Sequence, residues 1–302
     1  MAARKRVLTV VPGLRLLAAI LVGVVAMAAL VIVPGRAAAA GPAAVNWQGA
    51  GPSPRPVEGQ NGAVAIYPTD ATTTYVYLPA ISVSRVCQPI PGESYDVWPV
   101  SPPPTDRPAE EHGDLNLTLR GYELTSATKG LVDYSGGTDD KAPQLPGLFT
   151  DDRTPTFSDV YQVHHWNWGC NCRGPVITDP EVTLAGMAVT PGETIHVPGS
   201  GYDIGAGYEV LVLYASKERI TLKYTREDNV VWGYTIHVEN VCVEPSLLAL
   251  YESWNKAGRD HLPALRAGQA FGRARSDEIR VAIRDTGAFL DPRSRKDWWK
   301  GR

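Results

Sequence analysis

The densest run of chemically capable side chains occupies residues 163–173, which read Val-His-His-Trp-Asn-Trp-Gly-Cys-Asn-Cys-Arg. The imidazoles of His164 and His165 and the thiols of Cys170 and Cys172 fall within nine residues, and both kinds of group are common metal ligands. Consecutive side chains of a strand point to opposite faces, so the imidazoles diverge while the thiols share a face. Because the four groups do not converge locally, the run favours structural disulfides over a metal site.

Trp166 and Trp168 lie in the same run, two residues apart, and this spacing puts both indole rings on one face of a strand. Such a pair has two interpretations. It packs into the core, or it lies on the surface and stacks against sugar rings or a protein partner. The pair is therefore a candidate aromatic binding patch.

Four cysteines, Cys87, Cys170, Cys172 and Cys242, provide an even number of thiols for two disulfides. Cys170 and Cys172 are so close in sequence that pairing with each other is sterically unfavourable. We therefore expect each of them to bridge to a distant segment, one to Cys87 and the other to Cys242.

The amino terminus has the pattern of an export signal: a basic start, an uncharged apolar stretch over residues 16–33, and three alanines at residues 38–40. We expect cleavage there and a secreted or extracytoplasmic protein, in a compartment where disulfides persist. The apolar stretch is 18 residues long, so an uncleaved membrane anchor is the alternative. Without residues 1–40, which hold five basic and no acidic residues, 24 basic residues face 32 acidic ones. This negative balance argues against nucleic acid as a partner.

Composition divides the rest of the chain. Residues 41–62 have the Gly and Pro content of a flexible tether. In the next region, β-branched and aromatic residues over 63–86 and alternation over 115–124 predict strands, whereas the prolines of 88–112 disfavour a helix or a central strand. The predicted organisation is a signal peptide (1–40), a tether (41–62), a β-rich region packed on the C-terminal sheet (63–182) and a β domain (183–302).

The C-terminal region has the clearest strand pattern. Alternating or continuous apolar runs separated by Gly or Pro predict strands over 193–197, 208–215, 219–224, 233–243 and 278–284. One amphipathic helix interrupts them, beginning at Pro245 and ending at Gly258. At the chain end, Trp298 and Trp299 either anchor the protein to a lipid or wall polymer or pack back on the sheet. The sequence therefore predicts a mainly β protein with antiparallel sheets and one inserted helix.

Five segments of residues 183–293 carry a family resemblance. They are the strand and turn Gly192–Gly201, the following strand Tyr208–Leu213, the strand Gly233–Val243, the Gly-Gln motif in Leu265–Gly272, and the last strand with its Asp-Pro turn, Glu278–Pro292. Together they resemble the catalytic domain of lysostaphin or LytM-type zinc endopeptidases, which cut peptidoglycan cross-bridges. The resemblance implies a compact antiparallel sheet, or β-roll, of the LytM type, with Leu265–Gly272 as a hairpin.

The zinc ligands of that family are absent at the matching positions. Leu184 and Ala188 stand in place of its His-x-x-x-Asp pattern, and Glu278 and Arg280 in place of its His-x-His. A catalytic zinc needs imidazole and carboxylate ligands, and an arginine repels the ion. Only His237 matches the active-site histidines. The resemblance therefore implies a catalytically degenerate scaffold with no cofactor.

We therefore expect an exported, non-catalytic cell-envelope binding or regulatory protein whose partner is a cell-wall peptide, a glycan or an envelope protein. The resemblance puts the binding groove near Tyr202, Tyr208, Tyr234 and the remnant His237. One alternative is an active zinc metallopeptidase that recruits His164, His165 or His196. Another is a purely structural surface or adhesion domain.

Overall fold

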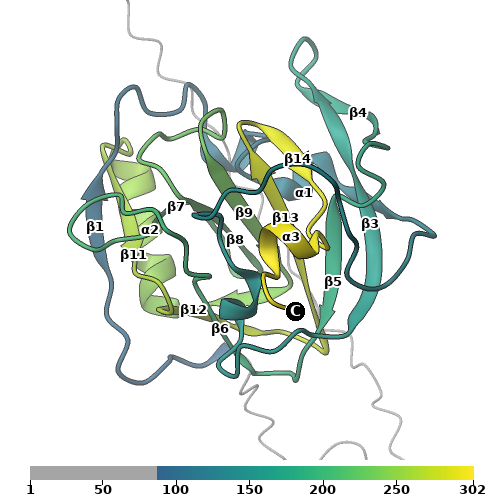
Figure 1. Ribbon diagram of the computed structural model, residues 1–302. Helices are drawn as coiled ribbons and strands as arrows, with labels where there is room; N and C mark the ends of the chain where they lie inside the picture. Colours follow the sequence, from purple (N-terminus) through teal and green to yellow (C-terminus); the bar gives the residue numbers. More distant parts are fainter. Residues whose placement is uncertain (1–86) are drawn as a thin grey trace, which may run out of the picture. The chain divides into compact units, whose positions relative to one another are not determined.

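The computed structural model describes residues 87–302 (Figure 1). The predicted signal peptide, the tether and the strands predicted over 63–86 lie outside the described residues. Within residues 87–302, no helix is long and apolar enough to cross a membrane.

Two antiparallel sheets build the described part of the chain, which confirms the predicted mainly β class. The larger sheet has eleven strands in the order β1-β11-β7-β8-β9-β13-β5-β3-β2, with β14 also paired to β13 and β4 to β3. Its strands are β1 (Asp96–Pro99), β2 (Tyr122–Leu124), β3 (Phe157–Asn167), β4 (Cys172–Val176), β5 (Leu184–Ala188), β7 (Val210–Ala215), β8 (Arg219–Lys223), β9 (Tyr234–Glu239), β11 (His261–Leu265), β13 (Glu278–Asp285) and β14 (Ala288–Leu290). The smaller sheet has the order β10 (Val241–Val243), β12 (Ala270–Ala274) and β6 (Thr194–His196).

Helical structure in residues 87–302 is limited to three α-helices, α1 (Leu117–Arg120), α2 (Pro245–Ala257) and α3 (Arg295–Trp298), and two 3-10 turns, η2 (Ala109–Glu111) and η3 (Leu145–Leu148). The predicted helix α2 begins at Pro245, and Gly258 ends it in the left-handed conformation with φ of 110°. The Glu244 side chain caps its first turn by accepting hydrogen bonds from the backbone N–H groups of Ser246 and Leu247. In Figure 1, α2 lies beside β11, at the opposite side of the molecule from the β3–β4 hairpin.

Two local predictions were wrong. The predicted strand over residues 115–124 is a helical turn followed by the short strand β2. Leu117 and Arg120 are buried three residues apart, which is a helical spacing, and Gly121, with φ of 66°, ends the turn. The Leu265–Gly272 segment is not a hairpin, because β11 belongs to the larger sheet and β12 to the smaller one. The segment therefore connects the two sheets.

The domain boundary expected at residue 183 falls between β4 and β5. Strands from both sides of this boundary belong to the same sheet. Strand β3 pairs directly with β5, with Val160 opposite Ala185. The edge strand β1 pairs with β11 in the same sheet, and Pro99 at the end of β1 agrees with the rule that proline tolerates an edge position. Residues from both sides of the expected boundary therefore share the sheet that positions the site.

The two faces of the central strands differ in polarity. On one face, the side chains of β8, β9 and β13 are aliphatic and belong to the main core, among them Leu222, Ile236 and Ile283. Trp298 and Trp299 are buried in this same core, so they pack back on the fold. The other face of the same three strands carries mainly polar and charged side chains, although these too are buried or half-buried.

Candidate functional site

The polar face of the sheet is organised in rows across β8, β9 and β13. Register places Lys223, Thr235 and Arg284 in one row, Thr221, His237 and Ala282 in the next, and Arg219, Glu239 and Arg280 in the third. A sheet face covered by protein is normally apolar, because burial of a polar group is costly unless the group is hydrogen-bonded. The concentration of these groups on one covered face makes that face a candidate functional surface.

Residues 109–121 and strand β14 cover this face. The Thr221 hydroxyl donates to the backbone carbonyl of Leu115 over 2.7 Å, and this bond ties the covering segment to the sheet. From the other side, the ring of Phe289 in β14 stacks on the His237 imidazole, with ring centroids 6.2 Å apart and planes inclined by 26°.

Three charged side chains form the floor of a pocket at the edge of this cover. Arg284 of β13 donates through Nη1 to Asp114 Oδ1 over 2.8 Å, and Arg120 of α1 donates through Nη2 to the same oxygen over 2.5 Å. The exposed fractions of the side chains are 4% for Arg284, 7% for Arg120 and 15% for Asp114. Both guanidinium groups also lie over the ring of Phe289, 4.5 and 5.4 Å from its centre. The arrangement is a buried ion triad with one more positive than negative charge.

Burial and ion pairing act against each other in this triad. Burial alone would raise the pKa of Asp114, but the guanidinium groups of Arg284 and Arg120 hold it down at about 2. Burial lowers the pKa of Arg284 to about 10, even though Asp114 opposes that change. Asp114 and Arg284 are therefore both ionised near neutral pH.

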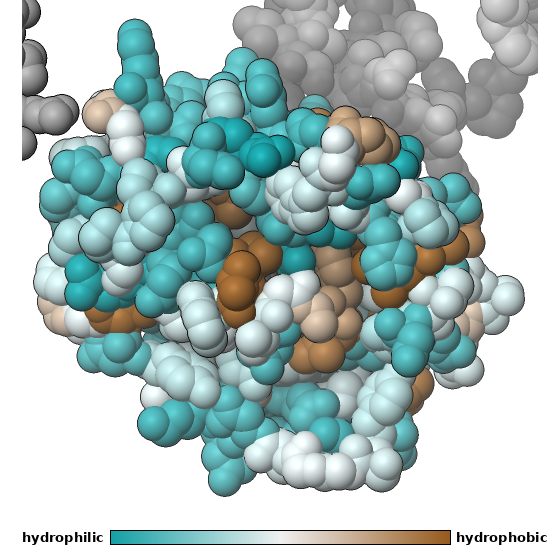
Figure 2. Space-filling view, turned by 90° about the horizontal axis from the view of Figure 1, so that it is seen from above, coloured by the Kyte–Doolittle hydropathy of each residue, from teal (hydrophilic) through white to brown (hydrophobic). Residues whose placement is uncertain are grey.

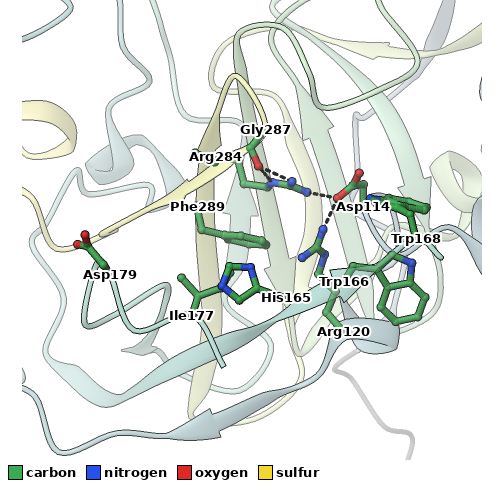
Figure 3. Close-up of a pocket in the computed structure, with 11 residues that line it drawn as sticks. Asp114, Arg120, His165, Trp166, Trp168, Ile177, Asp179, Arg284, Gly287 and Phe289 are labelled. Carbon is green, nitrogen blue, oxygen red and sulfur yellow. Dashed lines mark hydrogen bonds and ion pairs between the residues drawn. The ribbon is translucent and has the colours of Figure 1, made fainter. Parts of the chain in front are cut away.

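The pocket above the triad has a volume of about 350 Å³. The residues that line it include the triad, Phe289, Trp166 and Trp168, and on the outer side His165, Ile177 and Asp179 (Figure 3). In Figure 1 the β3–β4 hairpin and the β13–β14 turn both rise to the top of the molecule. Seen from above, hydrophilic residues cover most of that face, with apolar groups visible between them near its centre (Figure 2).

The two tryptophans form an edge-to-face pair at the pocket, with ring centroids 6.3 Å apart and planes at 75°. Trp166 lies directly over Gly113, where a Cβ atom would come within 2.6 Å of the indole, so only glycine fits beneath the ring. Trp168 is 43% exposed, and it contacts the imidazole of His112 and the guanidinium of Arg107, 5.0 and 4.8 Å from its ring. The pair is thus held from beneath and from the side, and Trp168 keeps a face toward solvent.

The disulfide pairing predicted from the sequence was wrong. Cys170 bonds to Cys172 at the tip of the β3–β4 hairpin, and Cys87 bonds to Cys242. A disulfide between Cys170 and Cys172 is sterically unfavourable only when the backbone between them is extended. Here Asn171 adopts a left-handed conformation with φ of 50°, and the turn brings the two Cα atoms to 5.2 Å, within the range of ordinary disulfides. The short disulfide closes the turn that directly follows Trp168.

His237 is buried beneath the cover with its Nε2 atom unpaired. The Thr221 hydroxyl uses its proton on the Leu115 carbonyl, so it accepts from His237 Nδ1–H over 3.0 Å. Nε2 then carries a lone pair without a hydrogen-bond partner among the described residues. Burial, reinforced by Arg284 and Arg120, holds the pKa of His237 well below its ordinary value, so the ring is neutral.

The four residues of the predicted groove are not brought together. Tyr202 and Tyr234 are neighbours, with ring centroids 6.1 Å apart and both hydroxyls donating to Asp139. Tyr234 and His237 are three residues apart in β9 and therefore point to opposite faces of the sheet. Tyr208 packs against Trp98 near the edge strand β1, with centroids 5.5 Å apart. The expectation of one groove was wrong because it ignored this alternation.

The positions that the resemblance aligns with zinc ligands share one face of neighbouring strands. Leu184 and Ala188 belong to β5, Glu278 and Arg280 to β13, and His237 to β9, and β13 pairs with both other strands. Even-numbered residues of β13 point to the polar face, together with the residues opposite them in register. The positions that the sequence resemblance aligns with zinc ligands therefore lie on one face of the sheet.

On that surface, the side chains of Glu278 and Arg280 in β13 belong to a hydrogen-bonded network. Arg280 Nε donates to Glu278 Oε1 over 2.6 Å and to the Tyr161 hydroxyl over 3.2 Å. Tyr161 in turn donates to Glu278, which also accepts from the Ser158 hydroxyl. Arg280 Nη1 donates to the Tyr122 hydroxyl over 3.1 Å. The network engages both carboxylate oxygens of Glu278 within the protein.

The other histidines considered for a metal lie apart. His164 points into the protein and its Nδ1 lies 2.7 Å from the Gly174 carbonyl, whereas His165 is exposed at the pocket. His196 belongs to β6 in the smaller sheet. Within residues 87–302, no group of three His, Cys, Asp or Glu side chains is placed to hold a metal ion.

Sequence reasoning found the tryptophan pair and missed the charged floor beneath it. Asp114 precedes, and Arg120 lies within, the segment 115–124 whose alternation predicts a strand, and Arg284 reads as an ordinary polar position of an amphipathic strand. One signal was available, because Glu278, Arg280 and Arg284 all fall on one face of β13. Comparison of the chain with protein-family models, curated proteins and solved structures gives no match.

Proposed function

We propose that the protein is an exported, non-catalytic cell-envelope binding protein whose pocket at Trp166 and Trp168 binds cell-wall glycan. The observation that carries this proposal is an aromatic pair fixed at the mouth of a pocket that also has charged hydrogen-bond donors. Indole rings stack against the apolar faces of sugars, and polar groups nearby fix the orientation of a ligand. The pocket combines both.

We further propose that residues 183–302 are a degenerate endopeptidase scaffold. Support comes from the antiparallel sheet and from Leu184, Ala188, Glu278, Arg280 and His237, which fall on one face of β5, β13 and β9. Glu278 is already paired to Arg280, and a positively charged neighbour disfavours a divalent cation. The role assigned to this surface is structural, and binding takes place at the tryptophan pocket.

A sedimentation assay with purified insoluble cell wall tests the binding proposal. Trp168→Ala removes an exposed ring from the pocket, so retention on the wall is expected to weaken by roughly three- to tenfold. Trp232→Ala is the matched control, because Trp232 is 60% exposed and does not line the pocket. Equal retention of the wild type and Trp168→Ala would contradict the proposed site. If none of the three proteins is retained, a structural or adhesion role replaces binding.

Metal analysis separates this proposal from the zinc-peptidase alternative. We expect purified protein to carry no stoichiometric zinc and a chelator to leave wall binding unchanged. About one zinc per chain, lost together with peptidase activity in His237→Ala, would overturn the non-catalytic assignment.

A further inference from the structure

We infer that the ligand of the tryptophan pocket is an acidic saccharide, whose anionic group pairs with Arg284 and Arg120 while its sugar ring lies against Trp166 and Trp168. This inference rests on the proposed function and specifies the substrate class of that site. The anion is a carboxylate or a phosphate ester, since both match the planar fork of donors on a guanidinium group.

The first support is the unbalanced charge of the pocket floor. Two guanidinium groups share one oxygen of Asp114, and all three side chains are at most 15% exposed. A buried charge without a counter-charge is costly, so an incoming anion gains more here than at a solvated arginine. Burial, together with the charges of the same two arginines, lowers the pKa of the neighbouring His237.

The second support is the number of N–H groups on the two arginines that are not used in hydrogen bonds within the described residues. A guanidinium group has five N–H donors. Arg284 uses Nη1 on Asp114, and Nε and Nη2 on the Gly287 carbonyl. Arg120 uses Nε on the Gly113 carbonyl, Nη1 on that of His164, and Nη2 on Asp114. Each terminal nitrogen therefore makes one hydrogen bond within the described part of the chain and holds a second N–H.

The third support is the position of the remaining acidic group. Asp179 also lines the pocket, but it is exposed, and Figure 3 shows it across Ile177 and His165 from the arginine pair. Its charge is therefore solvated at the rim, whereas the arginine charges lie on the floor beside Trp166. The anion is expected at the arginine end and the neutral part of the ligand toward the tryptophans.

Aromatic geometry favours a saccharide over an acidic peptide. Two indole rings at 75° present a flat surface and an edge, and Trp168 keeps 43% of its surface exposed. A pyranose ring has a flat apolar face of matching size, while its hydroxyls bond to polar neighbours. An acidic peptide is treated as an outcome of the test.

Calorimetric titration of the intact protein with matched ligands tests the inference. The probes are an oligosaccharide of uronic acids, its neutral methyl ester, the corresponding neutral oligosaccharide, a sugar phosphate and an acidic peptide. The free acid is expected to bind about tenfold or more tightly than its methyl ester, and added salt should reduce that preference. The sugar phosphate shows which anion the arginines prefer.

Substitutions test whether the anionic group of the ligand binds at Arg284 and Arg120. Arg284→Lys keeps the charge and loses the fork, so the preference for the acid over the ester should fall severalfold while near-ultraviolet circular dichroism confirms folding. Arg266→Lys is the matched control, since Arg266 also lies over an aromatic ring, Tyr208 at 4.4 Å, but outside the pocket. A preference that Arg284→Lys leaves unchanged would overturn the assignment.

The outcomes distinguish this inference from the proposed function. Equal binding of acid and ester, lost in Trp168→Ala, overturns the acidic class and keeps glycan binding at the pocket. Tighter, Trp168-dependent binding of the acidic peptide overturns the saccharide. If no saccharide binds and wall stripped of glycan still retains the protein, both proposals fail.

Discussion

At the scale of single residues, Asp114 is the group on which the pocket floor depends. Its carboxylate is the shared partner of two buried guanidinium groups, from a covering segment and from a central strand. Removing one member of a buried ion pair usually costs more than the pair contributes, because the remaining charge is left unpaired. Asp114 should therefore matter for stability as well as for binding.

Asp114→Asn is expected to lower the free energy of unfolding by about 3 kcal/mol, because two arginines lose their buried counter-charge. Urea denaturation measures the change. Asp106→Asn is the control, since the side chain of Asp106 is 79% exposed and pairs with Arg107 at the surface. A loss no greater than that of the control would show that the triad does not connect the cover to the sheet.

The contribution of the Asp114 carboxylate to stability should also depend on pH. Because the pKa of Asp114 falls from 3.8 to about 2 on folding, its stabilising effect is complete above pH 4 and is lost as the pH falls toward 2. Unfolding free energies of the wild type over this range should fall more steeply than those of Asp114→Asn. Parallel curves for the two proteins would contradict the depressed pKa.

At the scale of elements, the two disulfides differ in the length of chain that they close. Cys87–Cys242 spans 155 residues, whereas Cys170–Cys172 spans two. In the chain-entropy model, the stabilisation by a disulfide grows with the logarithm of loop length. The long disulfide therefore has a structural role, and the short one serves the local shape of the β3–β4 turn beside Trp168.

Serine substitutions test this division. Replacing Cys87 and Cys242 together should cost about 5 kcal/mol of stability, whereas replacing Cys170 and Cys172 should cost about 1–2 kcal/mol. The second variant should nevertheless weaken glycan binding, because the turn next to Trp168 loses its closure. Thermal unfolding and the wall-binding assay measure the two effects. A variant without the short disulfide that binds normally would remove its role at the site.

Element type was easier to predict than the assembly of elements. Helix α2 followed from Pro245, the spacing of its apolar residues and Gly258, all of which are local signals. The turn at Leu117–Arg120 did not, because an alternating leucine pattern and a helical turn share several apolar positions over so short a stretch. The pairing of Cys170 with Cys172 depended on the backbone of one residue, Asn171, which the spacing of cysteines does not reveal.

At the scale of the whole molecule, the unusual property is a polar sheet face under a cover. Alternation in β8, β9 and β13 predicts that one face is polar, and exposure to water is the simplest expectation for such a face. Whether the face is covered depends on residues 109–121, which are distant in sequence and overlap the segment 115–124, where alternation predicts a strand. The charged floor of the pocket therefore belongs to tertiary structure and lay beyond sequence analysis.

Burial of His237 gives the fold a second dependence on pH. Because the folded state holds its pKa well below 6.5, the unfolded chain binds more protons, and stability should fall as the pH drops below 6.5. His237→Asn keeps a donor for Thr221 and should reduce that slope by up to about 1.4 kcal/mol per pH unit. Equal slopes for the wild type and His237→Asn would place a proton on the folded His237.

The most direct test of glycan binding at the tryptophan pocket follows the indole N–H signals of the tryptophans by NMR during titration with soluble cell-wall glycan fragments. We predict that the signals of Trp166 and Trp168 shift with the same dissociation constant, while those of the buried Trp298 and Trp299 stay in place. If saturating glycan shifts the signals of neither Trp166 nor Trp168, or shifts only those of tryptophans outside the pocket, glycan does not bind at this pocket.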